Sequence, residues 1–253
     1  MEKLSRRDFF QNSLGSILAL SLVNSLCDAQ ALTGSVKTIA HKWVIEMEQI
    51  TKSLRKHKIR QIEWQQQIES LLSEVNLKDL FRAIDYDRLA KTVVFPENHE
   101  SMEDIAFPKI KGLSEELSFN PYFFAMKKDV AIVPHGHQNM TTMHMVLSGE
   151  AHGWHYDRIA DEPNHLIIKP TSDKLLTAGA VSTISDEKDN IHWFKATTEK
   201  VFIFNIGVYI LNPKQSYTGR DYIDPVNGEK LKDGLIRARK INQEESYKIY
   251  GKS

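Results

Sequence analysis

The sequence predicts a mainly β fold, a jelly-roll barrel preceded by an N-terminal helical segment. Short apolar runs separated by turn clusters fill the chain after Pro96, which is typical of an antiparallel sandwich or barrel. Before Pro96, apolar residues recur every three or four positions, as they do on one face of a helix. We therefore divide the chain into a leader at 1–31, a helical segment at 32–95 packed on the barrel, and the barrel at 96–253 with a C-terminal wrap.

The leader resembles a twin-arginine export signal. Arg6 and Arg7 precede the apolar stretch Leu14–Leu26, and Ala29–Ala31 offers a small-x-small cleavage site. The alternative is an ordinary amphipathic first helix. The signal predicts transfer by the twin-arginine translocase, removal of the leader, and a mature protein that is periplasmic or secreted.

Composition excludes several classes of function. Lysine plus arginine equals aspartate plus glutamate at 33 each, so there is no net charge to attract nucleic acid or an anionic membrane. After the leader, no apolar run reaches the about 20 residues that a stable membrane anchor needs. The only cysteine, Cys27, lies within the leader. A mature chain without cysteine has no disulfide, no thiolate ligand and no cysteine nucleophile.

The segment from Thr38 to Lys91 has the apolar spacing of two or three helices. Asn76 and Asp85 interrupt the spacing as caps or breaks, and no flexible linker separates the segment from the predicted barrel. A coiled-coil partner helix is the competing interpretation. The apolar positions are Ile39, Trp43, Met47, Ile50, Leu54, Trp64, Ile68, Leu71 and Val75.

The remainder of the chain alternates short strands with turns. Strands are expected at Ala131–Val133, Met143–Leu147, His165–Ile168 and Val201–Val208. Turns are expected at Leu147–Gly149, Lys169–Thr171 and Ser185–Asn190. The polar tail after Asn212 is expected to wrap the surface and to end in a helical turn.

Three histidines are candidate metal ligands. His135 and His137 lie two residues apart, a spacing that points both side chains to one face of a strand. His192 lies beside another apolar run that a barrel would bring alongside. Three neutral imidazoles suit one Fe(II) per chain with free coordination positions, and they also suit zinc, nickel or copper. Taken alone, the His-x-His pair also fits hydrogen-bonded core histidines.

The residues around His135 resemble the first motif of the cupin family. That motif has His-x-His, a polar position four or five residues later, and then a glycine after six more residues. Thr142 and Gly149 occupy those two places. Many cupins carry a glutamate ligand where Thr142 stands, so the resemblance implies the subset of cupins that holds its metal by three histidines.

Within that subset, the chain resembles the thiol dioxygenases of the cysteamine dioxygenase and plant cysteine oxidase group. The resemblance covers Val130 to Asp221. The matching segments are Pro134–Thr141, Val146–Gly149, Tyr156–Asp157, Asn190–Ala196 and Gly219–Asp221. Two features depart from the family: Asn205 stands where an aspartate is usual, and a Pro-Pro-Tyr segment just beyond it is missing.

Other polar residues are assigned by the same resemblance. Tyr156, Asp157 and Arg220 are candidate catalytic residues, and Arg220, like Arg158, has the planar shape that holds a carboxylate through two hydrogen bonds. Structural roles at a strand end and in surface ion pairs are the alternatives. His144, His152 and His155 are assigned no ligand role.

The resemblance implies an Fe(II)-dependent enzyme that adds dioxygen to a thiol to give a sulfinate. The thiol is a small aminothiol, free cysteine or an N-terminal cysteine of a peptide, and the sequence does not separate these. One alternative is a non-catalytic periplasmic cupin that binds its metal as a binding or sensing module. Another is a cupin enzyme of a different substrate class.

Overall fold

The computed structural model describes residues 32–107 and 109–252, with residues 32–41 described as backbone only. The export signal predicted at 1–31 lies outside the described residues. The chain forms two units, Met1–Ile39 and Ala40–Ser253. Of the first unit, only the helical backbone from Leu32 is described. Across the described ranges, each helix is too short or too polar to cross a bilayer.

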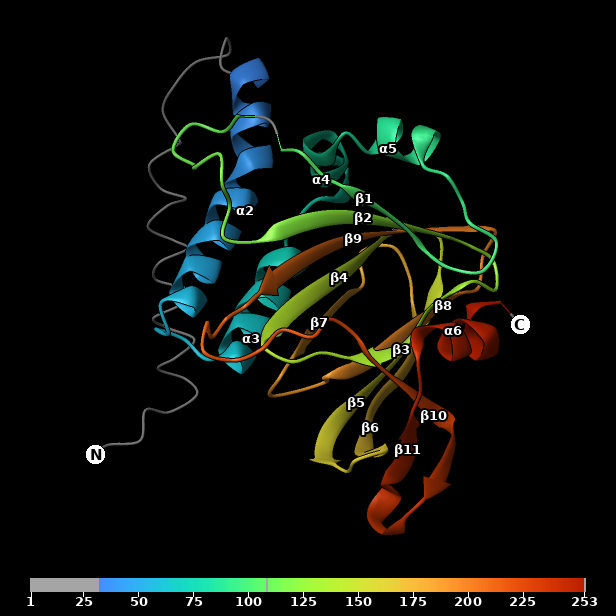
Figure 1. The fold of residues 1–253 in the computed structure, drawn as a ribbon. Coiled ribbons are helices and arrows are strands. Elements are labelled where there is room, and N and C mark those ends of the chain that lie inside the picture. Colours follow the sequence, from blue (N-terminus) through green and yellow to red (C-terminus); the bar gives the residue numbers. More distant parts are fainter. Residues whose placement is uncertain (1–31, 108, 253) are drawn as a thin grey trace. The chain divides into compact units, whose positions relative to one another are not determined.

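The fold-class prediction is confirmed, because the chain is mainly β and contains a closed six-stranded barrel that follows a helical segment (Figure 1). One sheet has the strand order β1-β2-β9-β4-β7, and the barrel has the order β10-β11-β6-β5-β8-β3. The bounds are β1 Ser101–Asp104, β2 Asn120–Lys127, β3 Ala131–Gly136, β4 Met140–Ser148, β5 Ala151–Asp161, β6 His165–Leu176, β7 Val181–Ser185, β8 Ile191–Ala196, β9 Lys200–Tyr209, β10 Asp221–Lys230 and β11 Ile236–Lys240.

Between Leu32 and Thr92 the structure has four helices, where two or three were expected. They are α2 Leu32–Arg55, α3 Gln61–Ser73, α4 Leu77–Ile84 and α5 Tyr86–Thr92. The Asn76 side chain caps α4 by accepting a hydrogen bond from the Lys78 backbone N–H, and Asp85 divides α4 from α5 in the left-handed conformation. Both residues are breaks that the sequence indicated.

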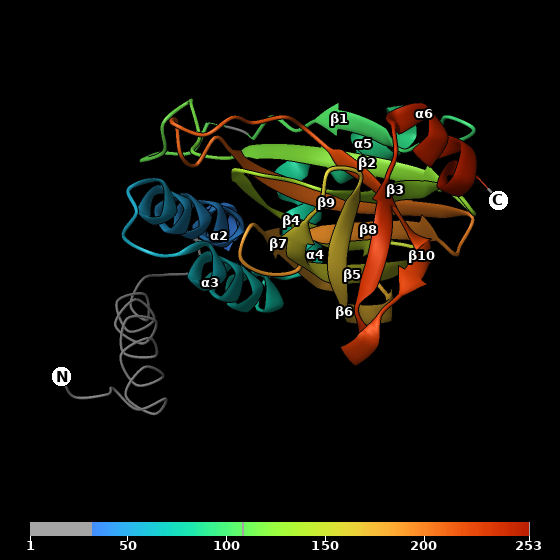
Figure 2. The same cartoon turned by 60° about the horizontal axis from the view of Figure 1, so that its bottom comes forward.

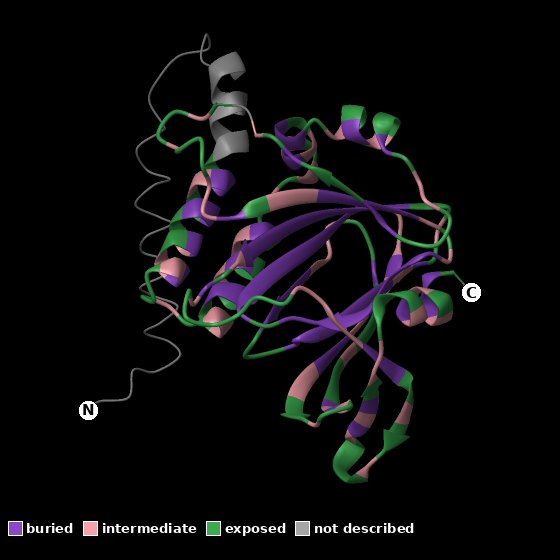
Figure 3. Cartoon of the chain, in the orientation of Figure 1, coloured by how far each residue is buried: buried purple, intermediate pink, exposed green. Residues whose placement is uncertain are grey.

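The helices cover the outer face of the five-stranded sheet. Their apolar residues share one buried cluster with Phe123 of β2, Met143 of β4 and Phe204 of β9. The indole of Trp43 contacts the ring of Phe204 edge-on, with 5.9 Å between ring centroids. Figure 3 shows the buried residues concentrated in the central strands and the helix faces beside them. From Trp43 onward, the periodic apolar positions are therefore used for core packing rather than for a coiled-coil partner.

A second buried cluster lies between the two sheets. It joins Phe124 of β2, Val146 of β4 and Ile203 of β9 to Ile132 of β3 and Phe194 of β8. We call the residues between the β4–β7–β9 side and the β3–β8–β5 side the inter-sheet layer. A third cluster lies on the opposite face of β3, β8 and β5, toward β6, β10 and β11.

The C-terminal region differs from the expected surface wrap. Asp221–Lys230 and Ile236–Lys240 are strands, and β10 closes the barrel by pairing with β3. Their alternation is weak in the sequence because charged residues occupy the exposed face and the tip of this hairpin. The expected final helical turn is present as α6 Gln243–Ser246, continued by Tyr247–Gly251 beside β3 and β10 (Figure 2).

The prediction of a turn at Lys169–Thr171 is also wrong, because these residues lie within β6. Pro170 pairs with Tyr156 where the β5–β6 register shifts between His155 and Tyr156. A strand tolerates proline at such an irregularity, where a ladder hydrogen bond is already missing. The turn at Leu147–Gly149 is correct, and Gly149 adopts a φ of 77° there.

Candidate metal centre

His135, His137 and His192 lie together in the inter-sheet layer. Each offers a nitrogen, and these three nitrogens lie within 4.8 Å of one another. His135 is on β3, His137 follows the end of that strand, and His192 is on β8. The ring centroids of His135 and His192 are 4.3 Å apart, and those of His135 and His137 are 4.7 Å apart. The structure thus brings together the three residues that the sequence named as ligands.

A β-bulge in β3 turns His135 toward the inter-sheet layer. Ile132 pairs with Phe194 and His135 pairs with His192, so β3 has one residue more than β8 between these two pairs. Without the extra residue, strand alternation would place Ile132 and His135 on opposite faces. The bulge therefore allows a core residue and a candidate ligand three positions apart to share one face.

Backbone carbonyls orient all three imidazoles. The Nδ1 of His135 lies 2.7 Å from the carbonyl oxygen of Val133. The Nδ1 of His137 lies 3.2 Å from the Gly219 carbonyl, and that of His192 lies 3.3 Å from the Asn190 carbonyl. A carbonyl only accepts hydrogen bonds, so each Nδ1 carries the proton. Each Nε2 is left with a free lone pair, which is the arrangement that metal-ligating histidines use.

Burial keeps the three side chains neutral. It lowers the pKa of His135 and of His192 well below the usual range, and both residues are only 1% exposed. Burial, together with the nearby Arg220 charge, lowers the pKa of His137 to about 4. Neutral imidazole is the form that binds a metal, so the group needs no deprotonation near pH 7.

The donor set fits a single divalent transition metal. Three imidazole nitrogens converge without a carboxylate among them, and imidazole suits iron, zinc, copper and nickel. Asn190 supports the group by donating from its amide to the backbone carbonyls of His137 and Ser185, at 2.8 and 3.1 Å. That bridge joins the turn after β3 to the loop before β8. The residues present fit iron, zinc, copper or nickel.

The two uncharged residues that depart from the expected patterns are hydrogen-bonded to each other. The Thr142 hydroxyl donates to the Ile206 carbonyl at 2.9 Å. The Asn205 amide donates to the Thr142 hydroxyl and to the Met143 carbonyl, both at 2.8 Å. These contacts tie β4 to β9 on the side facing the histidines. Neither side chain replaces a carboxylate ligand.

Arg220 lies beside the histidine group but is already paired. Its Nη1 donates to Glu100 at 2.7 Å, and the hydroxyl of Tyr247 donates to the other carboxylate oxygen of Glu100 at 3.0 Å. The Arg220 pKa is raised above the usual range: burial alone would lower it, but the Glu100 carboxylate outweighs burial. The Arg220 charge helps to lower the pKa of both His135 and His137. Its predicted catalytic role remains a prediction.

Tyr156 lies on the other face of β5 from the histidines. His155 pairs with His192 across β5 and β8, and Tyr156 pairs with Ile191. Successive residues of a strand point to opposite faces, so Tyr156 joins the third apolar cluster with Trp193. The structure does not bring this predicted catalytic residue to the candidate metal centre.

Asp157 and Arg158 hold backbone and loops in place. Asp157 accepts a hydrogen bond from the Asp189 backbone N–H at 2.8 Å, which fixes the loop that leads to His192. Arg158 donates to Asp161 and Asp221, at 2.8 and 2.9 Å. Arg158 therefore forms ion pairs, which was the alternative to a role in binding a substrate carboxylate. The predicted catalytic role of Asp157 remains a prediction.

Two of the three histidines to which the sequence assigned no ligand role, His144 and His155, lie in the inter-sheet layer. His155 shares its face with His192, and its Nε2 lies 2.8 Å from the Ser182 hydroxyl. His144 projects from β4 on the opposite side, with 5.4 Å between its ring centroid and that of His192. The alternation of His144 with the apolar Met143 and Met145 was the available signal. It shows that His144 faces away from the helices, but it does not identify the residues on that side.

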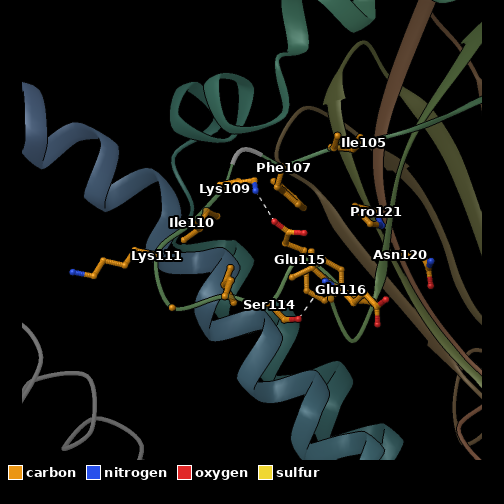
Figure 4. Close-up of a pocket in the computed structure, with 15 residues that line it drawn as sticks. Ile105, Phe107, Lys109, Ile110, Lys111, Ser114, Glu115, Glu116, Asn120 and Pro121 are labelled. Atoms are coloured by element: carbon orange, nitrogen blue, oxygen red, sulfur yellow. Dashed lines mark hydrogen bonds and ion pairs between the residues drawn. The ribbon is translucent and has the colours of Figure 1, made fainter.

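A surface hollow lies apart from the histidine group. It has a volume of about 1000 Å³ and is lined by residues of the segment from Ile105 to Pro121 (Figure 4). Lys109 and Glu115 form an ion pair of 2.6 Å within it. None of the three candidate ligands lines this hollow.

Comparison with known proteins gives only weak likenesses. No family model and no curated protein sequence matches the chain. Recombinant oxalate oxidase in complex with glycolate aligns at 17% identity over 50% of this chain and 56% of that one, with a TM-score of 0.35. KdgF from Halomonas sp. aligns at 9% identity over 43% and 76%, with a TM-score of 0.31. Procruciferin, an 11S globulin from Brassica napus, aligns at 14% identity over 37% of this chain and only 21% of that one, with a TM-score of 0.29.

Proposed function

We propose that the chain is an Fe(II)-dependent thiol dioxygenase of the cupin type, which adds both atoms of dioxygen to a thiol and yields a sulfinic acid. The observation that carries the proposal is the buried group of three neutral imidazoles without a carboxylate. Such a set leaves free positions on an octahedral ion for two reactants. The bound metal would lower the pKa of the thiol and supply the redox chemistry. The thiol is a small aminothiol, cysteine or a peptide with an N-terminal cysteine.

The protein's own residues would position the reactants and exclude water. The carbonyls of Val133, Gly219 and Asn190 hold the imidazoles, and the apolar residues between the sheets keep the surroundings dry. Arg220 offers a positive charge close to His137. Glu100 and Tyr247 both contact its Nη1, and no described residue hydrogen-bonds its Nε or Nη2. Where the substrate is free cysteine, we assign that edge of the guanidinium to its carboxylate.

The proposal includes export by the twin-arginine translocase and action in the periplasm or outside the cell. That translocase moves folded proteins, so the metal would be acquired before export. The support is the order of the arginine pair, apolar stretch and cleavage site in the leader.

The deciding experiment measures oxygen consumption by anaerobically iron-loaded protein with cysteamine, cysteine and peptides that begin with cysteine. Mass spectrometry of the product is expected to show two added oxygen atoms, both from labelled dioxygen. His192→Ala serves as the metal-free control. Arg220→Met is expected to slow the reaction while most of the metal is retained. Iron-loaded protein that consumes no oxygen with any of these thiols would refute the proposal.

A second candidate is a non-catalytic metal-binding or sensing module. This candidate is favoured by the burial of the three histidines, since His135 and His192 are each 1% exposed. Asn205, on the facing sheet, is also hydrogen-bonded to Thr142. The same assay separates the two candidates. Stoichiometric metal without oxygen consumption supports the module.

A further inference from the structure

His144 faces the candidate metal centre from the opposite sheet. It lies on β4, where it pairs with Asn205 of β9 and Ser182 of β7. Its ring centroid is 4.9 Å from that of Phe194 and 5.4 Å from that of His192, and the residue is 5% exposed. Its imidazole therefore lies in the inter-sheet layer, next to the histidine group and away from solvent.

One nitrogen of this imidazole has no partner among the described residues. The Nδ1 of His144 is buried and makes no hydrogen bond. Each of the other four histidines of the inter-sheet layer has one: His135, His137 and His192 contact carbonyls, and His155 contacts the Ser182 hydroxyl. Buried polar atoms in proteins are nearly always satisfied, so an exception beside a candidate centre indicates a missing partner.

The side-chain N–H and O–H groups of Asn205 and Ser182, the two residues that pair with His144, are already engaged. Asn205 donates its amide hydrogens to Thr142 and Met143, and the Ser182 hydroxyl contacts His155. His144 is also outside the group of three whose nitrogens lie within 4.8 Å of one another. A metal held by that group would have His144 as a neighbour across the layer rather than as a ligand. The described residues therefore leave the Nδ1 of His144 without a partner on the side of the candidate metal centre.

We propose that His144 donates a hydrogen bond to the small anion that binds at the free positions of the metal. The inference rests on the proposed metal site and deepens it, because it names a residue that would contact the bound molecule rather than the metal. With its proton on Nδ1, the neutral imidazole donates from that atom and so favours an occupant with an acceptor atom, such as a thiolate sulfur or the terminal nitrogen of azide. The hydrogen bond would select anionic occupants over neutral ones of the same size.

Azide binding to the cobalt-loaded protein tests this without turnover. Wild type, His144→Leu and the matched control His155→Leu are loaded with Co(II), the metal content is measured, and azide is titrated by visible absorption. His144→Leu should keep one metal per chain and bind azide about tenfold or more weakly, the size of effect expected for a hydrogen bond to a charged group. His155→Leu should keep the azide affinity of wild type.

Thermal unfolding of the metal-free proteins tests whether His144 instead has a purely structural role, because the loss of a stabilising contact would lower the melting temperature. His144→Leu should keep or raise the melting temperature, because it removes an unsatisfied polar atom, whereas His155→Leu should lower it by stranding Ser182. A second variant, His144→Gln, retains a donor and should keep the azide affinity within about threefold of wild type.

Three outcomes would overturn the inference: wild-type azide affinity in His144→Leu, loss of the metal from that variant, or equal weakening in His144→Leu and His144→Gln. A wild-type chain that binds no metal would overturn both this inference and the proposed function. A chain that binds metal and azide as expected but oxidises no thiol would remove the proposed function alone.

Discussion

His135 and His192 stand directly opposite each other across the β3–β8 pair, with 4.3 Å between their ring centroids. Cross-strand neighbours of this kind share a face, so their positions are fixed by the ladder and not by a mobile loop. These two candidate ligands are therefore held in place before any metal arrives.

Replacing either histidine with alanine should empty the site. His135→Ala and His192→Ala each remove one of three ligands, and metal analysis of the purified proteins should find less than about a tenth of the wild-type content. The control is His152→Ala, because His152 stacks on Trp154 and contacts Asp173 at 2.5 Å, away from the group. Full metal in His192→Ala, or loss of metal in His152→Ala, would contradict the assignment.

Removing Glu100 should destabilise the chain strongly. Glu100→Ala leaves the largely buried Arg220 without its carboxylate, which should lower the free energy of unfolding by about 3 kcal/mol. Tyr247→Phe removes only one hydrogen bond to the same carboxylate and should cost about 1 kcal/mol. Urea denaturation measures both. Equal effects of the two substitutions would show that the ion pair itself contributes little.

Alanine should be poorly tolerated at Gly149. A Cβ there would lie 2.1 Å from the backbone oxygen of Lys200, and the residue has a φ of 77°. The combined clash and strain should lower the free energy of unfolding by about 3 kcal/mol. Gly234→Ala is the matched control, since its φ is 73° and no atom lies within 4 Å of the added carbon. That variant should lose only about 1 kcal/mol, and comparable losses in a thermal-melt comparison would refute the role of the Lys200 contact.

The export signal gives a prediction that stands on sequence alone. Replacing Arg6 and Arg7 with lysines preserves the charge but removes the arginine pair, so the precursor should accumulate in the cytoplasm. Fractionation followed by immunoblotting distinguishes precursor from mature protein. Mature protein outside the cytoplasm in the double variant would exclude the twin-arginine route.

The histidine positions could be predicted because their signals are local. A His-x-His spacing and a third histidine beside an apolar run reveal candidate ligands without knowledge of the fold. The positions of Tyr156 and His144 relative to the candidate metal centre could not be predicted in this way, because they depend on how the strands pair and how the sheets pack. Tyr156 matches a family position yet points to the other face of β5, and His144 meets His192 only because β4 and β8 belong to sheets that face each other.

Irregularities in the strands explain why other parts of the fold could not be predicted from the sequence. The bulge before His135 and the register shift at Pro170 each break the two-residue alternation by which strands are predicted from sequence. The hairpin β10–β11 was missed for a related reason. Its exposed face is so rich in charge that the segment has the composition of a surface tail, although Ile223 and Ala238 are fully buried.

The pairing of β3 with both β8 and β10 has a consequence for the order of assembly. His135 meets His192 and Tyr222, so the surroundings of one histidine join segments that leave the ribosome far apart in time. Contacts of such long sequence separation form slowly, because the intervening chain must be ordered first. A nascent chain that has not yet released β10 cannot close the barrel around β3. Because His135 lies on the strand that pairs with β10, fragments truncated before Asp221 would lack a closed barrel around this ligand and would bind metal weakly.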